Sequence, residues 1–147
     1  MNKSTELLNE LIEAARDGRK FYLDAASKVE DAEVYQVFST QACAKELLIN
    51  DLSQHVVAHG AIASEDETLV GKTRMLYAEI LAALSADRDR IYVAQLEEVE
   101  GRLLERFRRA LKETESEDVR RMLSGHITTV RAGHERMKML KHRKRAA

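Results

Sequence analysis

The chain contains no proline and no tryptophan, one cysteine and six glycines in 147 residues. Proline and glycine interrupt helices most often, so their scarcity favours a helical protein. The single cysteine, Cys43, cannot form an internal disulfide, which fits a reducing compartment. No run of about 18 apolar residues is present, and the first ten residues are too polar for a secretory signal. We therefore expect an all-α, soluble, cytoplasmic protein that does not enter a membrane.

The sequence also lacks the patterns of common active sites. It has no glycine-rich phosphate loop, no cysteine pair and no recognisable nucleophile constellation. The Glu-x-x-His motif, which supplies ligands to di-iron sites in helical bundles, is absent as well. The residues three positions before the five histidines are Leu52, Val56, Leu123, Arg131 and Met139. We therefore expect no catalytic residues, no cofactor, no metal ligands and no enzymatic activity.

What is present is helical periodicity. Apolar residues recur at three- and four-residue steps in four long segments and one short one. The long segments cover about residues 5–29, 32–59, 92–111 and 119–140, and the short one covers 69–84. Gly60 suits a left-handed helix end, and Ser64 with Glu67 predicts a capping box before the short helix.

The lengths of the connections predict the topology. Short links near Glu30 and Thr114 make two antiparallel pairs, and the stretch 60–87 is long enough to cross the length of a bundle. These features predict a ferritin-like up-down four-helix bundle with an additional short crossover helix. We expect a single domain, residues 1–147, with a basic tail at 138–147.

Four polar residues fall at one level on the inner faces of this bundle: Gln41, Lys45, Glu100 and His126. A buried charge must be paired, so we predict a buried polar layer in which Lys45 pairs with Glu100, assisted by the other two and by Tyr22. The alternatives are a mononuclear metal or small-ligand site at this level, or side chains that point out of the core. Gly18 lies at the same level, and we expect a neighbouring side chain to need its space.

A second group of residues has spacing that a metal could use. Asp51, His55 and His59 follow one another at four-residue steps, which can place zinc ligands on one helix face. His59 also precedes Gly60, where an imidazole suits the negative end of the helix dipole, and we favour that capping role.

The charge is unevenly distributed. The first hundred residues carry a net charge of −9 and the remainder +8. This asymmetry predicts complementary charges within the bundle and between subunits, and the alternative is an anion-binding tail. Cys43 and Leu47 lie beyond the main stripe of the segment 32–59, and the segment 69–84 is amphipathic. Together with the charges, these features predict a homodimer. The basic tail lacks interleaved aromatic residues, so we expect no nucleic-acid binding. Its basic residues are Lys138, Lys141, Arg143, Lys144 and Arg145.

Three short motifs carry a family resemblance. They are Leu8-x-x-Leu11-Ile12 leading into Asp17-Gly18 and Tyr22, the acidic cluster Glu97-Glu98-Val99-Glu100, and the closing His134-Glu135-Arg136-Met137. The sequence resembles a family of bacterial ferritin-like proteins that is classed as a domain of unknown function, some of whose members are described as stress-induced. The resemblance implies a ferritin-like bundle and a link to the stress response, and it implies no reaction.

Two functions follow from these observations. The preferred one is a non-enzymatic bundle without a di-iron centre that acts by self-association or by binding another protein, in a stress-related role. The alternative is an atypical metal-binding or redox bundle that uses Glu100 and His126.

Overall fold

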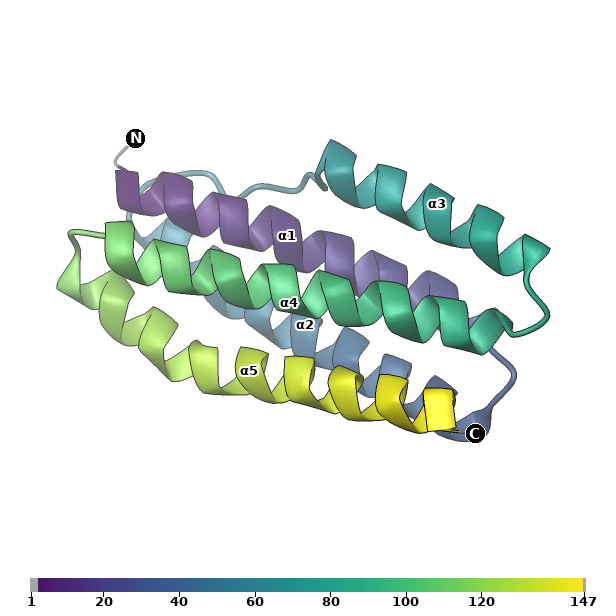
Figure 1. Cartoon of the computed structure of the whole chain (residues 1–147). Helices are drawn as coiled ribbons and strands as arrows, with labels where there is room; N and C mark the ends of the chain where they lie inside the picture. Colours follow the sequence, from purple (N-terminus) through teal and green to yellow (C-terminus); the bar gives the residue numbers. More distant parts are fainter. Residues whose placement is uncertain (1–2, 147) are drawn as a thin grey trace.

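Five helices and no strands make up the part of the chain that the computed structural model describes, residues 3–146, with only the backbone described at 145 and 146. Four long helices lie side by side as a bundle, and the short helix α3 lies outside them, along α1 and α4 (Figure 1). None of the described helices is long and apolar enough to cross a membrane. The helices are α1 Lys3–Ala26, α2 Ala32–Ala58, α3 Leu69–Leu84, α4 Arg88–Glu113 and α5 Glu117–Ala146.

The turn between α1 and α2 begins earlier than the periodicity predicts. Helix α1 ends at Ala26, because Ser27 to Val29 form a turn in which the amides of Lys28 and Val29 both donate to the Ala25 carbonyl. The buried carboxylate of Asp89 then accepts hydrogen bonds from the next two amides, those of Glu30 at 3.0 Å and Asp31 at 2.8 Å. This turn is therefore fixed by the first turn of α4.

Helix α2 ends as its sequence predicts. Gly60 has a φ of +78°, in the left-handed region that favours glycine, so the predicted helix end is confirmed. The amide of Ala61 donates back to the Val56 carbonyl at 3.2 Å, which closes the helix end. His59 is the C-cap residue and its position is set by this motif.

The predicted capping box at the start of α3 is wrong. The N-cap is Thr68, whose hydroxyl accepts from the Gly71 amide at 2.9 Å, and Ser64 and Glu67 lie in the preceding loop. Thr68 also donates twice to Asp17 on α1, from its amide at 2.8 Å and from its hydroxyl. Burial raises the pKa of Asp17 above its ordinary 3.8, while these hydrogen bonds act in the opposite direction. A contact with α1, rather than local sequence, selects the residue where α3 begins.

The core consists of two apolar clusters. One lies towards the end of the bundle that holds the α4–α5 turn and includes Leu11, Leu52, Phe107 and Leu123. The other lies towards the end that holds the α1–α2 turn and is rich in aromatic residues, among them Phe21, Tyr22, Phe38 and Tyr92. Between them, every long helix has a residue that belongs to neither cluster. These residues are Gly18 on α1, Lys45 on α2, Glu100 on α4 and Gly133 on α5.

Candidate functional site

The layer between the two clusters contains a buried ion pair. Lys45 Nζ lies 2.6 Å from Glu100 Oε1, and the side chains are 4% and 0% exposed. The hydroxyl of Tyr22 donates to the same Oε1 at 2.7 Å. Three helices, α1, α2 and α4, therefore meet at a single carboxylate oxygen.

Tyr22 is held in its neutral form. The pKa of Tyr22 is raised well above its ordinary 10.0, mainly by burial and further by the neighbouring Glu100 carboxylate. A neutral phenol can donate its proton to the carboxylate, whereas a phenolate would repel it. Lys45 Nζ also lies 5.7 Å from the centre of the Tyr22 ring, within the range of a cation–π contact.

Gln41 and the second carboxylate oxygen border the backbone of α5. Gln41 is buried, and Glu100 Oε2 is buried without a hydrogen-bond partner among the described residues. A Cβ built on Gly133 would lie 2.9 Å from Gln41 Oε1 and 3.2 Å from Glu100 Oε2. Gly133 is therefore the residue that makes room for this layer on the α5 side.

His126 does not belong to the layer, so the expectation that it does is wrong. Its Nε2 pairs with Oδ2 of Asp51 on α2, and a quarter of its side chain is exposed. Leu123 and Val130 are the fully buried residues of this part of α5, at 0% and 3% exposure, and Ile127 packs against the same core cluster. His126 falls at the edge of that stripe and faces the seam between α2 and α5. Glu100 and His126 therefore do not lie in one site, as the alternative metal-binding or redox function would require.

Gly18 also differs from its expected role. A Cβ added there would lie 3.7 Å from Lys45 Cε and 3.7 Å from Val99 Cγ1, which are ordinary van der Waals distances. No neighbouring side chain needs the space, so the close-packing argument fails for this glycine. It holds for Gly133 instead, at the same level on α5.

The two glycines should respond in opposite ways to alanine. Gly18→Ala should raise the free energy of unfolding by about 0.5–1 kcal/mol, because alanine favours the helix and meets no close atom. Gly133→Ala should lower it by about 1–3 kcal/mol, because its methyl group would push against the Glu100 carboxylate, which Lys45 and Tyr22 hold in place. Urea denaturation of both variants at one protein concentration measures the difference. Shifts of the same sign would show that the spaces around the two glycines are not as described.

The Tyr22 hydroxyl should contribute to the alkaline limit of stability. Its pKa is raised in the folded state, so its contribution is complete below pH 10 and is lost as the pH rises above that value. Above pH 10 the wild type should lose stability more steeply than Tyr22→Phe, by up to about 1.4 kcal/mol per pH unit. Tyr35→Phe, at an exposed tyrosine on α2, is the matched control and should follow the wild type. Parallel profiles for all three proteins would exclude a buried Tyr22–Glu100 hydrogen bond.

These residues do not fit a di-iron centre. Such a centre takes carboxylates from all four helices, two of them with a histidine three positions later. Here α1 and α5 contribute glycines, α2 contributes the cation of Lys45, and α4 contributes the one carboxylate of Glu100. One oxygen of that carboxylate already accepts from an ammonium and a phenol, and the ammonium would repel a metal ion. The layer is therefore a polar contact that joins helices.

The basic end of α5 makes ion pairs within the chain. Arg143 Nη1 lies 2.8 Å from Oε2 of Glu33, in the first turn of α2. Lys144 Nζ lies 3.5 Å from Oδ2 of Asp31, the N-cap residue of that helix. Hydrogen bonds from two α2 amides are the main reason why the pKa of Asp31 is lowered, and Lys144 adds to the effect. The side chain of Arg145 lies outside the described residues. Part of the +8 charge of the C-terminal segment thus neutralises acidic residues of the N-terminal segment.

The fold and the polar layer together define a class of protein, an all-α helical bundle whose core contains a buried ion pair. Comparison with protein families then identifies the chain. Residues 3–113 match a family described as a domain of unknown function (DUF2383), and the chain belongs to that family. The match covers α1 to α4, including Tyr22, Lys45 and Glu100, and ends before the His134 motif. Neither the curated proteins nor the solved structures gave a match.

Proposed function

We propose that this protein is a non-enzymatic, ferritin-like bundle that acts by self-association, as a homodimer formed through the outer face of α3. The observation that supports it most directly is the arrangement of apolar residues on α3. The link to the stress response rests on the family resemblance and stays a prediction. The buried layer supports the non-enzymatic part, because its one carboxylate is used to join helices.

Helix α3 has most of its large apolar residues on the outside. The residues that it buries against α1 and α4 are the small Ala78 and Ala82. Leu76 is 58% exposed and Leu84 is 82% exposed, which is unusual for side chains of this size at helical spacing. The large apolar residues exposed on this helix are Leu69, Val70, Leu76, Tyr77, Ile80 and Leu84. Such a stripe is typical of a helix that packs against a second surface.

The helix is attached to the bundle at several points. Asp17 of α1 accepts a hydrogen bond from its N-cap residue Thr68. Two residues of α3 form ion pairs: Glu79 Oε1 lies 3.1 Å from Lys28 Nζ, and Arg74 Nη1 lies 2.5 Å from Oε2 of Glu98 on α4. A groove of about 660 Å³ lies beside it, and Leu69, Val70 and Tyr77 form the apolar part of its lining. Because the face is held in place before binding, an association through it loses little conformational entropy.

A second copy of the chain is the occupant that we propose, because the apolar stripe can pack against itself. Two α3 helices that pack antiparallel about a two-fold axis near Leu76 and Tyr77 would present the same apolar stripe to each other. The exposed Glu65 precedes the stripe and the exposed Arg88 follows it, at similar separations in sequence from that centre. In the proposed dimer, antiparallel packing would bring the end of α3 that follows Glu65 in one copy towards the end that precedes Arg88 in the other.

Light scattering coupled to size-exclusion chromatography tests the proposal. The wild type should elute as a dimer, and the double variant Leu76→Glu, Ile80→Glu should be a monomer with unchanged helix content, since both side chains are exposed. Leu47→Glu is the matched control: Leu47 is a 71% exposed leucine on α2, away from α3, and its replacement should leave the dimer intact. High salt should weaken the dimer without abolishing it, because screening acts on the charged ends and not on the apolar stripe. A wild type that is monomeric at every concentration, or a dimer that survives in the double variant, would overturn the proposal.

A further inference from the structure

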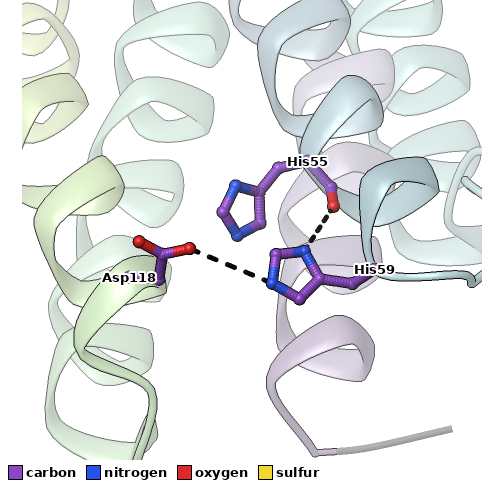
Figure 2. A group of neighbouring side chains, drawn as sticks. All are labelled: His55, His59 and Asp118. Atoms are coloured by element: carbon purple, nitrogen blue, oxygen red, sulfur yellow. Dashed lines mark hydrogen bonds and ion pairs between the residues drawn. The ribbon is translucent and has the colours of Figure 1, made fainter.

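Two histidines and an aspartate converge at the end of the bundle where α2 ends and α5 begins (Figure 2). His55 and His59 lie in the last turn of α2 and at its C-cap, and Asp118 lies in the first turn of α5. One nitrogen of each histidine and one oxygen of the aspartate all lie within 4.8 Å of one another. Asp51, which the spacing groups with the two histidines, pairs with His126 instead, and Asp118 takes its place.

The hydrogen bonding of His59 suits it for binding a metal. Its Nδ1 lies 2.9 Å from the His55 carbonyl oxygen, and because a carbonyl can only accept, this nitrogen carries the proton. In a neutral ring, Nε2 then has a free lone pair, and it faces Asp118 Oδ2 at 4.0 Å. A histidine that donates from one nitrogen to a carbonyl and presents the other is the usual form of a metal ligand.

His55 supplies the second, independent observation. Its Nε2 is buried and has no hydrogen-bond partner among the described residues. An unpaired buried polar atom is unfavourable, and nearly all such atoms have a partner in folded proteins. The His55 ring stacks on that of His59, with centroids 4.4 Å apart, so the two imidazoles lie together beside the aspartate. A cation between the three side chains would give this nitrogen its partner.

A metal would require a small closure of this group of side chains, whose ligand atoms lie within 4.8 Å of one another. Ligand atoms around a tetrahedral zinc ion lie about 3.3 Å apart, given bonds of about 2.0–2.1 Å. Among the neighbouring pairs of long helices, α2 and α5 are packed least closely, and a small approach of the first turn of α5 to α2 is part of the proposal. Arg121 lies 3.7 Å from Asp118 Oδ1, which leaves the other oxygen directed at His59. His59 itself is held by the helix end at Gly60.

We propose that His55, His59 and Asp118 form a zinc-binding site that links the C-terminal end of α2 to the N-terminal end of α5. Two imidazole nitrogens and one carboxylate oxygen suit Zn²⁺, and water would complete its four-coordinate shell. Mg²⁺ and Ca²⁺ prefer oxygen ligands, so a site with two imidazole nitrogens binds them poorly. The site lies on the seam opposite α3, so it does not depend on the proposed dimer (Figure 1).

Isothermal titration calorimetry with ZnCl₂ on the tag-free full chain tests the assignment. The wild type should bind one zinc ion per chain and gain thermal stability, and MgCl₂ should produce neither effect. His55→Ala, His59→Ala and the near-isosteric Asp118→Asn should each weaken zinc binding at least tenfold. His142→Ala, at an exposed histidine of α5, is the control for adventitious binding and should bind as the wild type does.

Three outcomes would overturn the proposal. The first is a wild type without saturable zinc binding, and the second is unchanged binding in the double variant His55→Ala, His59→Ala. The third is loss of binding in His126→Ala with retention in His59→Ala, which would place the ion at the Asp51–His126 pair. Asp118→Asn leaves both histidines and the helix end in place, so its circular dichroism without metal should match the wild type, and its loss of binding is then not a loss of fold.

Discussion

Glu100→Ala should lower the free energy of unfolding by about 3–5 kcal/mol. The substitution leaves the ammonium of Lys45 buried without its counter-charge, and it leaves the Tyr22 hydroxyl without its acceptor. Removing one partner of a buried ion pair has effects of this size because the remaining charge has neither water nor a partner. Chemical denaturation at a fixed protein concentration measures the loss, since stability depends on concentration in an oligomer.

Glu98→Ala is the matched control on the same helix. Glu98 forms an ion pair with Arg74, but its side chain is 52% exposed. Exposed pairs contribute about 0–1 kcal/mol, so this variant should unfold nearly as the wild type does. Equal, small losses in the two variants would show that Glu100 is not buried against Lys45.

Replacing Tyr22, Lys45 and Glu100 together by apolar residues should restore the stability that the single substitution loses. In the triple variant Tyr22→Phe, Lys45→Met, Glu100→Met, no charge and no hydroxyl of the group remains buried. Apolar replacements of similar volume for a buried ion pair are often neutral, or stabilising by about 1–4 kcal/mol. The triple variant should therefore be at least as stable as the wild type, and several kcal/mol more stable than Glu100→Ala.

The triple variant also separates structure from function. If the layer only joins helices, the variant should dimerise like the wild type in light scattering and should bind zinc with the same affinity. A triple variant as unstable as Glu100→Ala would show that the ion pair is net stabilising in this protein. That result would contradict the expected balance between desolvation and attraction.

The sequence predicts the helices and the inner positions of the layer well, for a physical reason. Helical periodicity assigns a residue to a face, and helices of similar length place residues such as Lys45 and Glu100 at one level. The same reasoning fails for His126, because a residue at the edge of an apolar stripe can face either the core or a seam. The buried stripe of α5 at Leu123 and Val130 decides between the two, and only the packed bundle shows where that stripe points.

Contacts between distant segments are the features that the sequence does not show. Thr68 rather than Ser64 caps α3 because Asp17, on another helix, binds it. Asp118 joins His55 and His59 because the end of α2 and the start of α5 share one end of the bundle (Figure 2). The expected topology contains a signal for this second contact, since it places both segments at the same end. Spacing along a single helix grouped Asp51 with the histidines instead.

The position of the ion pair has a consequence for how the helices align. Four rods of similar length with apolar inner faces could bury nearly the same area after a slide of one turn, about 5.4 Å. In α4, such a slide would bring Leu96 or Leu103 opposite Lys45 and would leave Glu100 without its cation. The desolvated charges would then be unpaired, at a large energetic cost. The Lys45–Glu100 pair therefore disfavours a shifted register of α4 against α2, in addition to the hydrogen bonds of Asp89, even if it adds nothing to the stability of the observed register.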